Sequence, residues 1–174
     1  MRVRLVPVED AALAAAARAL CAAPVDPPGI PDHDWLHGDP GEVLRRLRLA
    51  RDRRLAAGGR AWTIGADGAV VGYLSASIDD GGARAETFSV VARAEQGRGI
   101  GFAARRLALD ELAAAGIRSV VSLARPGSAS AAVSRRLGYR LTGTEERTHP
   151  DGYVVALERY ELRLPRGDAR MIGG

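Results

Sequence analysis

The sequence predicts a single-domain α/β (α+β) fold, with a mixed, mostly antiparallel central sheet flanked by helices on both faces. Strand-like segments follow one another between residues 61 and 92 with only short turns between them, which indicates an antiparallel meander. Beyond residue 92, helical segments alternate with strands, and a strand–helix–strand connection must add a parallel pair. The length of 174 residues suits one hydrophobic core.

The N-terminal third is expected to contain a strand, two helices and an irregular loop. Asp10 is a candidate helix cap, and Asp39 followed by Pro40 is a helix-start signal that Gly58 and Gly59 end. The expected segments are 2–6 for the strand, 11–22 for the first helix, 24–39 for the Pro-rich loop and 40–57 for the second helix.

The rest of the chain divides by its turn residues. Asp67-Gly68 predicts a hairpin, and residues 79–82 form a second turn. The expected strands are 61–65, 70–78, 85–92, 118–124, 139–145 and 154–164, and the expected helices are 99–115 and 128–137. Residues 1–164 would then form the domain, and residues 165–174 a flexible C-terminal tail.

Composition argues against several classes of protein. Every one of the 25 basic residues is Arg, the net charge is only +4 and aromatics make up 5%, so no nucleic-acid partner is expected. No apolar run approaches the roughly 20 residues of a membrane span, and no secretory signal is seen. Cys21 is alone, which excludes an internal disulfide and fits a cytoplasmic protein. The oligomeric state stays open, and a homodimer is compatible with the sequence.

No metal site is expected, because the three histidines do not have a metal-ligand spacing with Cys21. The arginines between residues 45 and 54 are expected on a solvated helix face, with a position beside a binding cleft as the alternative.

The densest chemical signal is the run Gln96-Gly97-Arg98-Gly99-Ile100-Gly101, between a predicted strand and a helix. Glycines let backbone N–H groups approach an anion, and the helix that begins there adds its positive end. Arg98 adds a full charge if it faces outward. A diphosphate is the natural ligand of such a site.

Other nucleotide sites fit this run less well. A P-loop requires a Lys, which the chain lacks altogether. A dinucleotide-binding fingerprint requires G-x-G-x-x-G after a parallel strand, whereas the spacing here is G-x-G-x-G after antiparallel ones. A glycine-rich turn that merely connects a strand to a helix remains the other interpretation.

The order of elements and the phrase over residues 91–101 resemble the GNAT superfamily of N-acetyltransferases. Gln96, Gly99 and Gly101 match that family's signature Gln/Arg-x-x-Gly-x-Gly/Ala. Ser130 with the later run Leu137-Gly138-Tyr139 resembles the family's Asn-x-x-Ser and Leu-Gly-Phe region. The match in element order covers about residues 2–164.

The resemblance implies a GNAT-like fold and acetyl-CoA (coenzyme A) as cofactor. Strand backbone would pair with the pantetheine arm, the glycine-rich amides would hold the pyrophosphate, and Ser130 would lie beside the thiol. The implied cofactor-binding residues are Ser89, Val90, Val91, Gln96, Gly97, Arg98, Gly99, Ile100, Gly101, Phe102, Gly127 and Ser130. Two positions depart from the family pattern: Gly127 stands where Asn is usual, and Ser134 stands where many members have the Tyr that protonates the leaving thiolate.

The chemistry that the resemblance implies is attack of an amine on a thioester. A backbone N–H near Val91 is a candidate for the oxyanion. Glu86 is the candidate general base, because it lies on the strand expected to line the cofactor; a solvated or Arg-paired carboxylate is its other interpretation. The catalytic candidates are thus Glu86, Ser130 and Ser134. The acceptor would be a small-molecule or peptide amine, and the alternative function is a degenerate sensor or interaction module that binds acyl-CoA without turnover.

Overall fold

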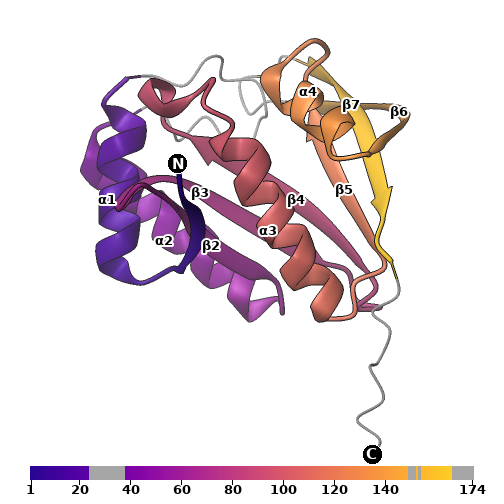
Figure 1. Cartoon of the computed structure of the whole chain (residues 1–174), viewed down its shortest axis with the longest axis horizontal. Helices are drawn as coiled ribbons and strands as arrows, with labels where there is room; N and C mark the ends of the chain where they lie inside the picture. The colour runs from indigo at the N-terminus through magenta and orange to yellow at the C-terminus, as the bar shows by residue number, and fades with distance from the viewer. Residues whose placement is uncertain (24–37, 149–151, 153, 166–174) are drawn as a thin grey trace, which may run out of the picture.

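The computed structural model describes residues 1–23, 38–148, 152 and 154–165. Seven strands form one sheet in the order β1-β2-β3-β4-β5-β7-β6, in which only the β4–β5 pair is parallel (Figure 1). The strands are β1 (Val3–Pro7), β2 (Arg60–Ala66), β3 (Ala69–Ile78), β4 (Arg84–Val91), β5 (Ser119–Ala124), β6 (Arg140–Thr148) and β7 (Val154–Arg163). The predicted mixed, mostly antiparallel sheet is confirmed.

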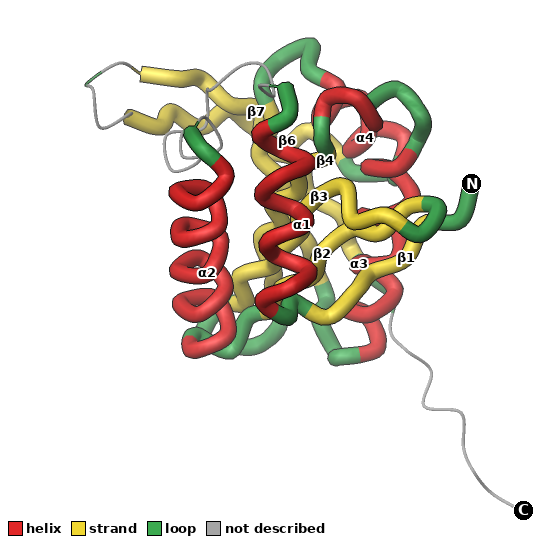
Figure 2. Tube along the Cα trace, turned by 90° about the vertical axis from the view of Figure 1, so that its left-hand side faces the viewer, coloured by secondary structure: helices red, strands yellow, loops and turns green. Residues whose placement is uncertain are grey.

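Helices cover both faces of the sheet, as expected (Figures 1 and 2). They are α1 (Asp10–Cys21), α2 (Pro40–Ala56), the short 3-10 helix η2 (Arg93–Glu95), α3 (Ile100–Ala114) and α4 (Ala129–Arg136). One core cluster joins α1 and α2 to the sheet, and a second joins α3 and α4 to the opposite face. In the described part of the chain, no helix is long and apolar enough to cross a bilayer.

The starts of the first two helices show one prediction confirmed and one corrected. The Asp39 carboxylate accepts hydrogen bonds from the backbone N–H groups of Gly41 and Glu42 at 2.8 and 3.2 Å, as its position before Pro40 predicted. In α1, however, the N-cap is Glu9, and Asp10 lies inside the first turn. Its carboxylate accepts hydrogen bonds from Arg51 and Arg48 of α2, which tie the two helices together and hold the pKa of Asp10 below its usual range.

Several sequence predictions fall outside the described residues. These are most of the Pro-rich loop expected over 24–39, the three histidines His33, His37 and His149, and the tail over 165–174 except for Pro165. The tail and the domain boundary at residue 164 stay predictions.

The parallel pair at the centre of the sheet is short. The β4–β5 register joins Arg84 to Ser119, Ala85 to Val120 and Glu86 to Val121, and ends there. Strand β4 continues to Val91, paired only with β3. The two strands therefore separate beyond Glu86, and the β5–β7–β6 unit diverges from β4 (Figure 1).

Gly72 of β3 allows the end of β4 to pack closely against β3 beside this opening. It lies opposite Val91, and a Cβ at residue 72 would overlap the Val90 carbonyl oxygen. Because the obstacle is backbone rather than a flexible side chain, we expect Gly72→Ala to destabilise the fold by about 1–3 kcal/mol, the usual cost of overpacking. Urea unfolding checks this, with Gly143→Ala on β6 as control, since a Cβ there meets no atom of the described residues within 4 Å. Equal stability of the two variants would show that Gly72 is dispensable.

Candidate active site

The exposed edge of β4 supplies the backbone part of the site. The Ala92 N–H donates to the Val71 carbonyl at 2.8 Å, so this N–H points toward β3. The Val91 carbonyl instead accepts from the Gln96 side-chain amide at 3.0 Å, on the other side of the strand. Because peptide groups alternate along a strand, Ser89 and Val91 direct their N–H and C=O groups into the opening between β4 and β5. Such an edge can accept an extended chain as an added strand.

The glycine-rich loop leads directly from this edge to the start of α3. Gly97 and Gly99 have left-handed φ values of +77° and +79°, which explains why glycine is needed at both positions. Gly99 is the N-cap of α3. Among the described residues, no atom lies within 4 Å of the position that a Cβ would take at either glycine. The side-chain positions of both glycines therefore face open space beside the start of α3, where backbone N–H groups could hold a pyrophosphate.

Arg98 does not offer an unpaired charge to that space. Its guanidinium donates to Glu95 and to Asp67, the latter at 3.2 Å. The charge expected from an outward-facing Arg98 is thus balanced by two carboxylates. An anion at the glycine-rich loop would therefore have to be held by backbone N–H groups and the helix terminus.

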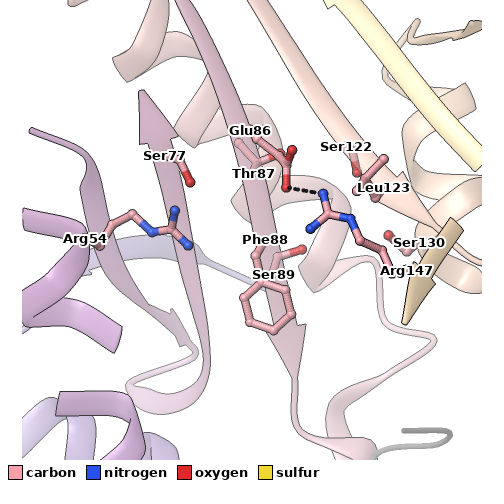
Figure 3. Close-up of a pocket in the computed structure, with 10 residues that line it drawn as sticks. All are labelled: Arg54, Ser77, Glu86, Thr87, Phe88, Ser89, Ser122, Leu123, Ser130 and Arg147. Atoms are coloured by element: carbon pink, nitrogen blue, oxygen red, sulfur yellow. Dashed lines mark ion pairs between the residues drawn. The ribbon is translucent and has the colours of Figure 1, made fainter. Parts of the chain in front are cut away.

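A pocket of about 320 Å³ lies where β4 and β5 separate (Figure 3). It is lined by residues from α2, β3, β4, β5, α4 and β6: Arg54, Ser77, Glu86, Thr87, Phe88, Ser89, Ser122, Leu123, Ser130 and Arg147. Three of the predicted site residues, Glu86, Ser89 and Ser130, line this pocket together.

Glu86 points to the face of the sheet that α1 and α2 cover. It lies opposite Ser77 in the β3–β4 register, and the pair Tyr73 and Val90 further along belongs to the core beneath α1 and α2. Side chains two residues apart share a face, so Glu86, Phe88 and Val90 all face α1 and α2. The carboxylate of Glu86 is half exposed and lies 3.9 Å from the Arg147 guanidinium. Glu86 therefore lines the pocket, as the general-base interpretation requires, and it also lies beside an arginine, as the alternative interpretation expected.

Serines line the opposite side of the same pocket. Ser122 lies two residues from both Val120 and Ala124, which belong to the core beneath α3 and α4, so its side chain is on the same face of β5. The Ser122 hydroxyl forms a hydrogen bond with Ser134 on that face. Strand alternation places Ser89 on this face too. The pocket is thus lined by side chains from both faces of the sheet.

The sequence profile described as the acetyltransferase (GNAT) family matches residues 29–139, well over half of the chain. The chain belongs to this family. A comparison with curated proteins finds no match.

Solved structures share the fold of this GNAT protein at low sequence identity. A putative acetyltransferase of Salmonella typhimurium, YncA, solved with acetyl-CoA, has a TM-score of 0.70 and 22% identity, covering 97% of this chain and 96% of the other. RimJ of Mycobacterium smegmatis, in complex with CoA-disulfide, has a TM-score of 0.78 and 23% identity, covering 92% and 81%. A phosphinothricin acetyltransferase of Sinorhizobium meliloti, in complex with acetyl-CoA, has a TM-score of 0.72 and 21% identity, covering 97% and 92%.

The two positions that depart from the GNAT pattern have different surroundings. Gly127 has a left-handed φ of +72°, a conformation that Asn tolerates better than most residues, and no Cβ contact would arise there within 4 Å among the described residues. Ser134 is fully buried and does not line the pocket. Its hydroxyl donates to the Ser130 carbonyl at 3.0 Å and accepts from the Arg105 guanidinium at 3.0 Å. The Ser134 hydroxyl is thus tied to the backbone of α4 and to Arg105, and a catalytic role for it stays a prediction.

Arg105 is buried, which the sequence did not indicate. Only 4% of it is exposed, its guanidinium donates to the Ser130 carbonyl at 3.4 Å, and it stacks over the Tyr139 ring at 5.2 Å. It thereby joins α3 to the segment that carries Ser130. An arginine on a predicted helix gives no signal of burial, because most such residues are solvated.

Proposed function

We propose that this GNAT protein transfers an acetyl group from acetyl-CoA to a primary amine by direct attack on the thioester. The observation that carries the proposal is the continuity of the open β4 edge with the left-handed glycines and the start of α3, beside a pocket that contains Glu86. The Ser89 and Val91 peptide groups would hold the pantetheine arm, and N–H groups of residues 97–102 the pyrophosphate. The solved relatives that contain acetyl-CoA or coenzyme A support this choice of donor.

Glu86 is the residue that we assign to the proton of the acceptor. It accepts one proton from the ammonium group, directly or through water, which frees the nitrogen lone pair. The nitrogen then bonds to the thioester carbonyl carbon while a peptide N–H near Val91 stabilises the developing oxyanion. The carbon–sulfur bond breaks, the second nitrogen proton goes to the thiolate, and the proton held by Glu86 is released to solvent.

Ser130 is the side chain that we assign to the departing sulfur, because it lines the pocket at the start of α4. Its backbone carbonyl accepts hydrogen bonds from the side chains of Arg105 and Ser134. Coenzyme A thiolate is a fair leaving group, so the loss of the family's Tyr at residue 134 is compatible with turnover.

Coenzyme A is expected to stabilise the folded protein. A ligand at 100 times its Kd that binds only the folded state adds about 2.7 kcal/mol, which corresponds to a Tm increase of roughly 5–10 °C for a domain of this size. Thermal unfolding with coenzyme A, NAD and ATP at equal concentration checks this. NAD and ATP should give much smaller shifts, and equal shifts with all three would indicate a nonspecific anion site.

Turnover separates an enzyme from a degenerate acyl-CoA-binding module. Steady-state release of free thiol from acetyl-CoA should depend on the presence of an amine and rise with its concentration. Saturable coenzyme A binding without thiol release across a broad amine panel would identify the module instead.

A further inference from the structure

The half of the pocket that faces α1 and α2 is built around a second cation, Arg54. This residue lies in the last turn of α2 and lines the pocket with Ser77 and Glu86. Gly59 makes room for its side chain, because a Cβ at residue 59 would lie 2.8 Å from the Arg54 Cδ, and 2.5 and 2.9 Å from the carbonyl oxygens of Ala76 and Arg54. Figure 3 shows the guanidinium directed from α2 toward β3 and β4.

The charges of this half of the pocket are unequal. Arg147 donates to Glu145 at 2.7 Å and lies 3.9 Å from Glu86, so its charge is shared between two carboxylates. Among the residues that the structure describes, no carboxylate forms an ion pair with Arg54. Of the described side chains that line the pocket, two are guanidinium groups and one is a carboxylate.

Such a site disfavours a simple monoamine. An acceptor amine enters largely as an ammonium ion, which Glu86 attracts but the Arg54 guanidinium repels. An acceptor that also carries a carboxylate removes this conflict, because a carboxylate is the group that a guanidinium binds best. Ser77 lies opposite Glu86 in the strand register, so the Ser77 hydroxyl is on the same face of the sheet as Glu86. This hydroxyl can donate a hydrogen bond to the carboxylate of the acceptor.

We propose that the acceptor is a small amino acid, whose carboxylate binds Arg54 while its amine lies at Glu86. The inference rests on the proposed acetyl transfer and names the class of acceptor for it. The pocket of about 320 Å³ is at the lower end of small-molecule sites, which suits a free amino acid beside the thioester.

The test compares each amino acid with its methyl ester, using thiol release by the full-length protein and by Arg54→Gln. In the wild-type protein the free amino acid should have the lower KM. Arg54→Gln should raise the KM for the amino acid roughly 10- to 100-fold, the scale of a lost charge-assisted hydrogen bond, and change the KM for the ester less than about 3-fold. Arg53→Gln is the matched control, since Arg53 lies in the same helical turn, is exposed and does not line the pocket.

Calorimetry gives a readout that does not depend on turnover. Titration of the amino acid into protein saturated with coenzyme A should show binding in the wild type and in Arg53→Gln, and much weaker binding in Arg54→Gln. If no amine of any kind releases thiol, the proposed acetyl transfer fails. If amines are acetylated but esters serve as well as free amino acids, or Arg54→Gln affects both equally, the acceptor inference fails and acetyl transfer stands.

Discussion

Replacement of Gly101 by Glu is expected to raise the dissociation constant for coenzyme A roughly 10²–10⁴-fold. Gly101 lies in the first turn of α3, two residues after the N-cap Gly99. A carboxylate there would repel the pyrophosphate and occupy the space through which it approaches the backbone N–H groups. Loss of two hydrogen bonds to a charged group, each worth about 1.5–3 kcal/mol, gives that range. Isothermal titration with coenzyme A measures it.

Gly101→Ala is the control for this variant. Gly101 has no left-handed φ, and a Cβ there would lie 3.9 Å from the Val91 side chain, an ordinary contact. The Ala variant should fold and bind coenzyme A nearly as the wild type does. Gly99 is a poorer site for the experiment, because its φ of +79° would strain any β-branched replacement. Wild-type affinity in a folded Gly101→Glu protein would exclude a pyrophosphate at this helix start.

Replacement of Glu86 by Gln is expected to lower kcat roughly 10²–10⁴-fold, the usual scale for losing acid–base catalysis. The amide keeps the shape of the side chain but cannot take the proton of the acceptor. The residual rate should climb as pH rises from 6 to 10, because the free-amine fraction then grows without help from the enzyme. The affinity for coenzyme A should hardly change, since the backbone contacts proposed for the pantetheine arm and the pyrophosphate do not involve the Glu86 side chain.

Glu146→Gln is the matched carboxylate control. Glu146 is an exposed residue on β6 that neighbours Arg147 in sequence and does not line the pocket. Wild-type turnover by Glu86→Gln across the pH range, with an acceptor that the wild type acetylates, would remove Glu86 from the mechanism and leave solvent or another group as the base.

The parts of the site that depend on local chain geometry were predictable from the sequence. Positive φ at Gly97 and Gly99 follows from a tight strand-to-helix turn, and a turn leaves a trace in a few consecutive residues. The same holds for the start of α2, where Asp39 and Pro40 act within one helical turn. The order of strands and helices followed from hydrophobic patterns and turn residues in the same way.

The parts that depend on distant segments were not predictable. Arg147 and Ser122 reach the pocket from β6 and β5, and no spacing in the chain marks their meeting. For the arginines between residues 45 and 54 the sequence offered a position beside a cleft only as the alternative, and it did not single out Arg54, which reaches the pocket from α2. The separation of β4 from β5 beyond Glu86 depends on how two strands more than thirty residues apart pair, as the Glu86–Val121 register shows. Asp10 was misplaced for a related reason: its carboxylate binds Arg48 and Arg51 of another helix instead of its own backbone.

A crystal structure of the protein with coenzyme A tests the central claim most directly. We predict the pantetheine arm along the β4 edge at Ser89 and Val91, the pyrophosphate against the N–H groups of residues 97–102, and the sulfur in the pocket between Glu86 and Ser130. Coenzyme A ordered elsewhere on the protein, with the opening between β4 and β5 filled by side chains, would contradict it.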